Sequence, residues 1–392
     1  MLYSIALILI VSLTLGLVFE KIKIPGLIAF MITGIILGPY VFDKISSDIL
    51  NISSDLRKIA LIAILIRAGL SLDLKDLKKV GRPTILLSFI PTTVEIVFIG
   101  LVSPLIFNIT SLEGFMLGSI VAAVSPAVVV PRMIHLIQNK TGTDKQIPQM
   151  ILAASSIDNI YAIVIFAIIS QAYQTGTFVV KQLFLFPVTI FSSLILGILI
   201  GLLLVYIFKK IHVRDTIKVL IIFGVSFFVI VFEDFIKDYF AISGLLAVIA
   251  LGSTILKTYP VLAERLTHKF SKIWVAAEIM LFVLVGATVD VSNIRSAGLL
   301  ALALILASLS LRMITVFIAT SKTGLNTKEK LFSCLAYMPK ATVQAAIGAI
   351  PLSMGVPAGN LILTISVLAI FVTAPIGAIG MDQLHKKLLK TT

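Results

Sequence analysis

The sequence contains 392 residues, of which 59% are hydrophobic and 13% are charged, and its mean hydropathy is +1.12. A soluble protein of this length carries far more charge. The composition therefore excludes a sizeable soluble domain and predicts an all-α polytopic membrane protein. The single cysteine, Cys334, excludes an intramolecular disulfide. No basic segment precedes the first apolar run, so no cleavable signal peptide is predicted.

Thirteen stretches are long and apolar enough to be candidate transmembrane helices, since a spanning helix needs roughly 20 such residues. The stretch at 57–72 is the shortest, and it contains Arg67. In chain order the predicted spans lie at about 2–19, 24–42, 57–72, 83–107, 113–136, 147–172, 179–208, 214–233, 239–256, 271–290, 296–319, 328–354 and 358–381.

The basic residues predict the orientation of these spans. If successive loops alternate sides, one side collects 22 of the 32 Lys and Arg residues and the other collects 6. This asymmetry places the basic loops in the cytoplasm. The C-terminus is then cytoplasmic and the N-terminus lies outside a plasma membrane. The net charge of +13 thus indicates topology and contact with anionic lipid at the cytoplasmic face, and not nucleic-acid binding. The four histidines fall at cytoplasmic ends, where solvated loop positions are the favoured interpretation.

The two halves of the chain contain related segments. Three pairs match at nearly the same separation along the chain, which we call the repeat offset: Ile24–Ala29 with Ile242–Ala247, Arg67–Leu72 with Val285–Asp290, and Ser125–Val128 with Met338–Ala341. Each pair is separated by seven spans, so the two copies have opposite orientations in the membrane. This pattern is typical of the inverted repeats of secondary transporters.

Two prolines at equivalent repeat positions predict two interrupted helices. Pro126 and Pro339 lie in the middle of spans 5 and 12, and proline removes a backbone donor from a helix. Irregular backbone at membrane depth must be buried in protein or line a cavity. We expect spans 5 and 12 to be discontinuous and to cross near the bilayer midplane, where their ends carry partial charges of both signs.

Two charged residues are candidates to compensate these helix ends. Asp158 carries the only charge between Ile147 and Ala172, and a charge at bilayer depth is a functional candidate by default. Lys340 is the only lysine deep within a span, and a buried lysine can exchange protons. The alternative interpretation is structural: a salt bridge between the two residues, or caps on the broken helices.

Other polar residues near these positions have more than one interpretation. The hydroxyls of Ser125, Ser155, Ser156 and Thr342 offer oxygen ligands for a dehydrated cation, although each is also a common packing group. Glu95 and Arg312 lie about one repeat offset apart in spans 4 and 11, and with Arg67 and Glu278 we expect them to form a structural buried ion network.

The chain resembles bacterial monovalent cation:proton antiporters with an NhaA-like fold, in the electrogenic branch with two adjacent aspartates. The resemblance extends from about span 2 to span 13. The segments that carry it are Ala154–Asn159, Val124–Val128, Met338–Gln344, Ala68–Leu72 and Val285–Asp290.

The resemblance implies a homodimer that exchanges Na⁺ or Li⁺ for protons by alternating access, with no cofactor. It implies a dimerisation domain, a core ion-transport domain and a linker helix. The expected boundaries are 1–56 and 213–268 for dimerisation, 57–175 and 269–384 for the core, 176–212 for the linker and 385–392 for a cytoplasmic tail.

One position departs from the family pattern. The family's second aspartate, which is its principal cation and proton carrier, corresponds to Asn159, while Asp158 matches the first aspartate. The first aspartate commonly pairs with the lysine that Lys340 matches. The resemblance places a Na⁺ site near Asp158 and Asn159. Because an amide cannot ionise, we expect the exchange of Na⁺ for protons to be impaired in this chain. Either the sequence is an engineered mimic of the protonated state, or a natural member works with Asp158 alone.

Two other functions remain open. The same fold suits transport of potassium or of a sodium-coupled organic anion. An intramembrane aspartyl protease requires two carboxylates that share a proton, and Glu95 and Glu278 are the only other deep carboxylates. The sequence favours a transporter rather than an enzyme.

Overall fold

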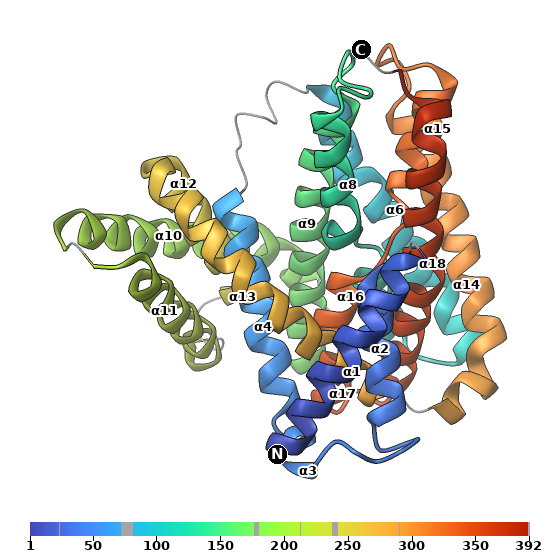
Figure 1. Cartoon of the computed structure of the whole chain (residues 1–392), viewed down its shortest axis with the longest axis horizontal. Coiled ribbons are helices and arrows are strands. Elements are labelled where there is room, and N and C mark those ends of the chain that lie inside the picture. The colour runs from blue at the N-terminus through green and yellow to red at the C-terminus, as the bar shows by residue number, and fades with distance from the viewer. Residues whose placement is uncertain are drawn as a thin grey trace. The chain divides into compact units, whose positions relative to one another are not determined.

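The computed structural model describes residues 1–22, 24–71, 81–175, 180–211, 213–236, 242–289 and 291–390. Within these ranges the chain forms helices joined by loops and turns, with no β-strand (Figure 1). The all-helical prediction is confirmed for the described residues. The helices are α1 (Leu2–Lys21), α2 (Gly26–Leu37), α3 (Ser47–Asn51), α4 (Ser53–Ser71), α6 (Arg82–Phe107), α7 (Ser111–Val121), α8 (Pro126–Gln138), α9 (Ile147–Thr175), α10 (Val180–Lys210), α11 (Asp215–Ile236), α12 (Gly244–Thr258), α13 (Pro260–Ala287), α14 (Val291–Ala319), α15 (Thr327–Ala336), α16 (Thr342–Ile347), α17 (Ile350–Ser353) and α18 (Gly359–Leu388).

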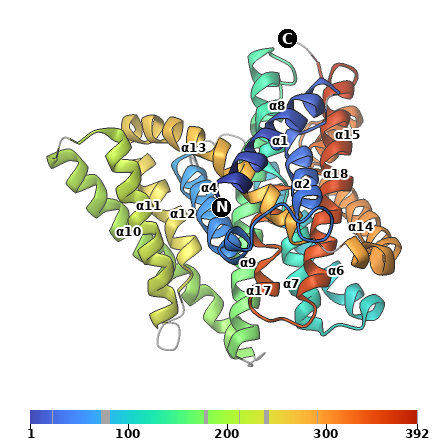
Figure 2. The ribbon, with the colours of Figure 1, turned by 60° about the horizontal axis from the view of Figure 1, so that its bottom comes forward.

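The chain divides into two compact units. Unit 1 contains Met1–Arg57, Lys75–Phe166 and Ile279–Thr392, and unit 2 contains Lys58–Leu74 and Ala167–Glu278. In unit 1, α14, α15 and α18 pack together, and α7 packs against α6 and α18 (Figures 1 and 2). In unit 2, α12 packs against both α10 and α11 (Figure 2).

Nine helices in the described part of the chain are long and apolar enough to cross a membrane. Three further apolar helices are shorter, at Gly26–Leu37, Gly244–Thr258 and Thr342–Ser353. These helices and α4 fall at predicted spans 2, 9, 12 and 3, respectively. The count of thirteen crossings stays a prediction.

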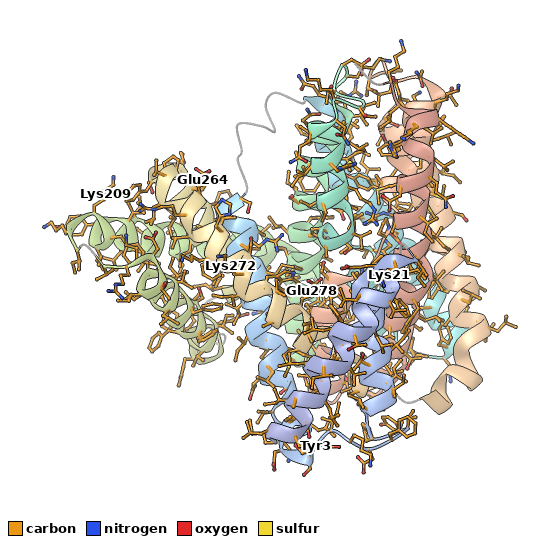
Figure 3. All side chains as sticks on the ribbon, in the orientation of Figure 1. Tyr3, Lys21, Lys209, Glu264, Lys272 and Glu278 are labelled. Carbon is orange, nitrogen blue, oxygen red and sulfur yellow. The ribbon has the colours of Figure 1, made fainter. Side chains whose placement is uncertain are left out.

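Several helix ends differ from the predicted spans, and a proline accounts for two of the differences. Helix α2 ends at Leu37, because Gly38 adopts an extended conformation with Pro39 after it, and the residue before a proline is disfavoured in a helix. Helix α13 begins at Pro260, eleven residues before the predicted span, where proline suits the first helical position. Its first turns are amphipathic: Leu266 is buried whereas Glu264 is exposed. Figure 3 shows Glu264, Lys272 and Glu278 in that order along this helix.

The helix contacts follow the sequence repeat. In unit 1, a Cβ added to Gly286 would lie 2.2 Å from the carbonyl oxygen of Met31. In unit 2, a Cβ added to Gly69 would lie 2.4 Å from the carbonyl oxygen of Ile249. Met31 and Ile249 are separated by the repeat offset, and so are Gly69 and Gly286. Both backbone approaches require glycine, so the same helix contact occurs once in each unit with the roles of the halves exchanged.

Helices α7 and α15 begin in the same way. Thr110 caps α7 and Glu113 completes the capping box, while Asn326 and Glu329 do the same for α15. Glu113 and Glu329 are also separated by about the repeat offset, and both are buried. These caps start the two helices that carry the predicted interruptions.

Candidate functional site

The two predicted interruptions exist and contact each other. Helix α7 ends at Val121 and α8 starts at Pro126, while α15 ends at Ala336 and α16 starts at Thr342. The backbone N–H of Ser125 donates to the carbonyl oxygen of Pro339 at 2.8 Å. All of these residues belong to unit 1. The prediction from Pro126 and Pro339 that both helices are broken is therefore confirmed.

The side chain of Asp158, on α9, contacts the backbone of the first break. Its side chain is fully buried, and its Oδ2 accepts from the backbone N–H of Val124 at 3.0 Å. Its Oδ1 accepts from the hydroxyl of Thr92 on α6. The carboxylate thus lies at the N-terminal end of α8, where a helix favours negative charge.

The predicted pairing of Asp158 with Lys340 is wrong. Asp158 pairs with Arg312 of α14, whose Nη2 lies 3.2 Å from both carboxylate oxygens. The Nη1 of the same guanidinium donates to Glu95 Oε2 at 2.6 Å and also to the carbonyl of Ala122. A planar guanidinium presents donors in several directions, so Arg312 contacts both Asp158 and Glu95, whereas the ammonium group of Lys340 contacts Glu95.

Lys340 pairs instead with Glu95. Its Nζ lies 2.8 Å from Glu95 Oε2 and 3.0 Å from the carbonyl oxygen of Ala122. Its backbone N–H donates to the hydroxyl of Thr373 on α18 at 2.8 Å. The ammonium group therefore lies at the C-terminal end of α7, where a cation is favoured. The expectation that one carboxylate and one ammonium compensate the broken ends agrees with this geometry.

The formal charges of this cluster cancel. Glu95 and Asp158 carry two negative charges, and Arg312 and Lys340 carry two positive charges. Each side chain is at most 1% exposed. Removing one member of such a buried group leaves an uncompensated charge and is strongly destabilising.

The predicted ion network is divided between the two units. Glu95 and Arg312 are joined in unit 1 as described. Arg67 and Glu278 belong to unit 2, where their charges attract each other and Trp274 donates a hydrogen bond to Glu278. The structural interpretation of these residues stays a prediction.

Several oxygens near the breaks have no hydrogen-bond partner among the described residues. The amide nitrogen of Asn159 donates to the carbonyl of Ser155 at 2.8 Å, which leaves its buried Oδ1 unpaired. The hydroxyls of Ser125 and Thr342 are likewise buried and unpaired. The Ser155 hydroxyl instead donates to the carbonyl of Leu152 on its own helix. Carbonyl and hydroxyl oxygens suit a dehydrated monovalent cation.

Four residues of the site were missed at the level of the sequence. Thr92 binds Asp158, Thr373 binds the Lys340 backbone, and the carbonyl of Tyr337 accepts from Arg312 Nε at 3.1 Å. Gln344 donates to carbonyls at the end of α7. Thr92 had a sequence signal, because it lies one helical turn before Glu95, and Gln344 ends the Met338–Gln344 segment that carries the resemblance.

Two of the histidines that were predicted to lie in loops line a cavity between helices. The cavity is about 270 Å³ in volume and lies between α8 and α18, beside the ion pair of Arg132 and Asp382 at 2.9 Å. His135 and His385 both belong to helices, so the loop interpretation is wrong for them. It is also wrong for His268 in α13, while His212 lies outside the described residues.

Comparison with known proteins gives consistent matches over nearly the whole chain. The model of a family described as "Sodium/hydrogen exchanger, transmembrane" matches residues 5–386. Sodium/hydrogen exchanger 9B2 of Mus musculus is 32% identical over 421 residues, which cover 99% of this chain and 74% of that protein. The protein of the same name from Xenopus tropicalis is 33% identical, with coverage of 96% and 72%.

A solved structure shares the fold. The sodium proton antiporter MjNhaP1 from Methanocaldococcus jannaschii matches with a TM-score of 0.82. The match covers 98% of this chain and 97% of the other at 20% identity. At that identity the match shows the polytopic antiporter fold alone.

Proposed function

Because the chain belongs to the transmembrane sodium/hydrogen exchanger family, we propose that it exchanges Na⁺ or Li⁺ for protons by alternating access. The unpaired, buried oxygens of Asn159, Ser125 and Thr342 beside Asp158 carry this proposal. The two broken helices cross near the bilayer midplane, and the cation binds there. Lys340 couples this movement to protons, since a buried lysine gains and loses a proton readily.

Asn159 limits this exchange. The four charged side chains around the breaks already cancel, so the site has no net negative charge with which to attract a cation. An aspartate at position 159 adds one negative charge, and either Na⁺ or a proton neutralises it. In the double-aspartate branch that the chain resembles, this position holds the carrier. The form with Asn159 therefore transports poorly, or it uses Asp158 alone after releasing it from Arg312.

The proposed setting is a plasma membrane, with the N-terminus outside and the C-terminus in the cytoplasm. The protein functions as a homodimer in which the core domain moves against the dimerisation domain. Anionic lipids contact the basic cytoplasmic loops. The repeated contacts at Gly69 and Gly286 support two related halves that exchange roles between the outward-facing and inward-facing states.

The test is dequenching of a pH-gradient dye in proteoliposomes. Proteins with Asn159 and with Asn159→Asp are compared for Na⁺, Li⁺ and K⁺, at matched reconstitution levels. We expect weak or no signal from the unaltered chain and robust Na⁺ and Li⁺ signals from the variant. Equal flux from both proteins refutes the role of position 159, and a response to K⁺ alone refutes the proposed selectivity.

A further inference from the structure

The broken end of α7 has an unusual set of partners. The last four carbonyls of a helix have no partner within it, and in a membrane interior they need one from elsewhere in the protein. Two carbonyls in the last turn of α7, those of Ile120 and Val121, and the two that follow the helix, those of Ala122 and Ala123, all accept from side chains. Ala122 is held by Lys340 and Arg312, and the other three are held by Gln344.

Gln344 makes these three contacts with one amide group. Its Nε2 lies 2.9 Å from the carbonyl oxygen of Ile120, 3.1 Å from that of Val121 and 2.9 Å from that of Ala123. The side chain is fully buried. Three oxygens surround this atom, so it must be the nitrogen, because the amide oxygen would repel them. Two N–H groups thus serve three acceptors.

These contacts determine which acceptors remain for Lys340. With Gln344 in place, Lys340 contacts the carbonyl of Ala122 among the four, and Glu95 is its other partner at 2.8 Å. Without the amide donor, three buried carbonyls next to Ala122 lose their partner. An ammonium group has three donors on a flexible stem, so it then moves toward these carbonyls and away from Glu95.

We propose that Gln344 is a positioning residue for transport, which keeps Lys340 on Glu95 and Ala122 by occupying the competing carbonyls of α7. The role in transport rests on the proposed exchange of cations for protons. The coupling between Gln344 and Lys340 does not, so it can be measured separately. The hydrogen bonds of the Gln344 side chain to other described residues go to carbonyls of Ile120, Val121 and Ala123 and not to a proposed ligand of the cation, so Gln344 acts through Lys340.

The first experiment measures thermal unfolding in detergent for four proteins: the unaltered chain, Gln344→Met, Lys340→Met and the double variant. If Lys340 moves to the vacated carbonyls, its new hydrogen bonds offset part of the stability that Gln344→Met loses. The double variant lacks the ammonium group, so its stability has no such compensation. We expect the double variant to unfold below the temperature given by the sum of the single shifts. Additive shifts overturn the proposal.

The second experiment measures the pH profile of exchange in chains that carry Asn159→Asp. Lys340 faces the charged groups of Glu95, Arg312 and Asp158, so a change in its contacts moves the pH of half-maximal rate. We expect Gln344→Met to move that pH by about half a unit or more and Gln149→Met, the matched control on α9, to leave it unchanged. An unmoved profile overturns the proposal.

Two safeguards keep the outcomes distinct. If Asn159→Asp shows no exchange, the proposed function fails and the unfolding cycle alone decides the coupling. If Gln344→Met does not fold, Gln344→Asn replaces it, because the shorter amide keeps its donors and reaches fewer of the three carbonyls.

Discussion

The two interrupted helices start alike and are held differently. Each begins at a capping box with a buried glutamate, Glu113 or Glu329. Each break is then held by the long helix that follows it in the same half of the chain. Asp158 of α9 accepts the N–H of Val124, and Thr373 of α18 accepts the N–H of Lys340.

The difference between the breaks lies in where each one places its charge. The charge at the first break comes from the carboxylate of Asp158 on α9. The equivalent acceptor at the second break is the uncharged hydroxyl of Thr373 on α18. The second break contains its charge within the irregular segment, at Lys340. Asp158 and Thr373 are separated by about the repeat offset. Both halves therefore have a side-chain acceptor for a backbone N–H at this position, but the acceptor is charged in the first half and neutral in the second. The two breaks therefore differ in the source of their charge, and in the proposed exchange the first break is the one whose carboxylate lies beside the cation.

The largest expected effect comes from removing the residue that joins both breaks. Arg312→Met leaves Lys340 as the one cation of the four-residue cluster described above, and breaking a buried charge cluster costs about 3–5 kcal/mol. Thermal unfolding in detergent measures the loss. The matched control is Arg132→Met, because its partly exposed pair with Asp382 contributes about 0–1 kcal/mol. Equal destabilisation by both variants contradicts the central role of Arg312.

The next test removes the charge that distinguishes the first break. Asp158→Asn keeps the shape but leaves the cluster with one excess positive charge, which repels a cation. In a chain that carries Asn159→Asp, we expect Na⁺-driven proton flux to fall by at least about tenfold, or about 1.4 kcal/mol at the site. Proteoliposome dequenching measures the flux. Retention of full flux shows that position 159 suffices without Asp158.

A smaller effect is expected from the equivalent residue at the second break. Thr373→Val leaves the buried N–H of Lys340 without its acceptor, which costs about 1–3 kcal/mol. Thr373→Ser keeps the hydroxyl and is the matched control. Thermal unfolding and flux are both measured, and we expect flux to fall less than in Asp158→Asn. If Thr373→Val reduces the flux more than Asp158→Asn does, the second break matters more for transport than the first.

The smallest expected effect lies at the start of α15. Lys145 binds Glu329 at 2.8 Å and is 35% exposed, whereas Glu113 of α7 binds the uncharged N–H of Ala358. Glu329 is 1% exposed but keeps the N–H of Asn326 as a donor when the ammonium group is removed. Lys145→Met therefore costs about 1 kcal/mol, the upper end of the range for exposed pairs, and the difference from the unaltered chain shrinks in high salt. Unfolding temperatures at low and high salt measure it. A salt-independent loss means that Lys145 acts through packing rather than charge.

Much of this arrangement follows from local sequence. Pro126 and Pro339 predict two helix interruptions because they occupy equivalent positions in the two halves of the chain. Proline alone is not sufficient, since Pro91 and Pro104 lie inside the continuous helix α6. Composition determines an all-helical membrane chain, since backbone groups in lipid must be satisfied within the chain. The repeat offset determines which segments resemble each other. Asp158, Lys340, Glu95 and Arg312 stand out because a charge in an apolar run needs a partner.

Tertiary structure alone decided which charges pair. Asp158, Glu95, Arg312 and Lys340 come from α9, α6, α14 and the second break, and their pairing depends on how far each side chain reaches across several helix axes. Sequence similarity favoured Asp158 with Lys340, but the guanidinium of Arg312 lies 3.2 Å from Asp158 and the ammonium of Lys340 lies 2.8 Å from Glu95. Gln344 lies in a segment that carries the resemblance, but its role could not be predicted for the same reason, because its three acceptors lie in the other half of the chain. Charge and proline act locally and can be read in order along the chain, whereas pairing depends on distances in space.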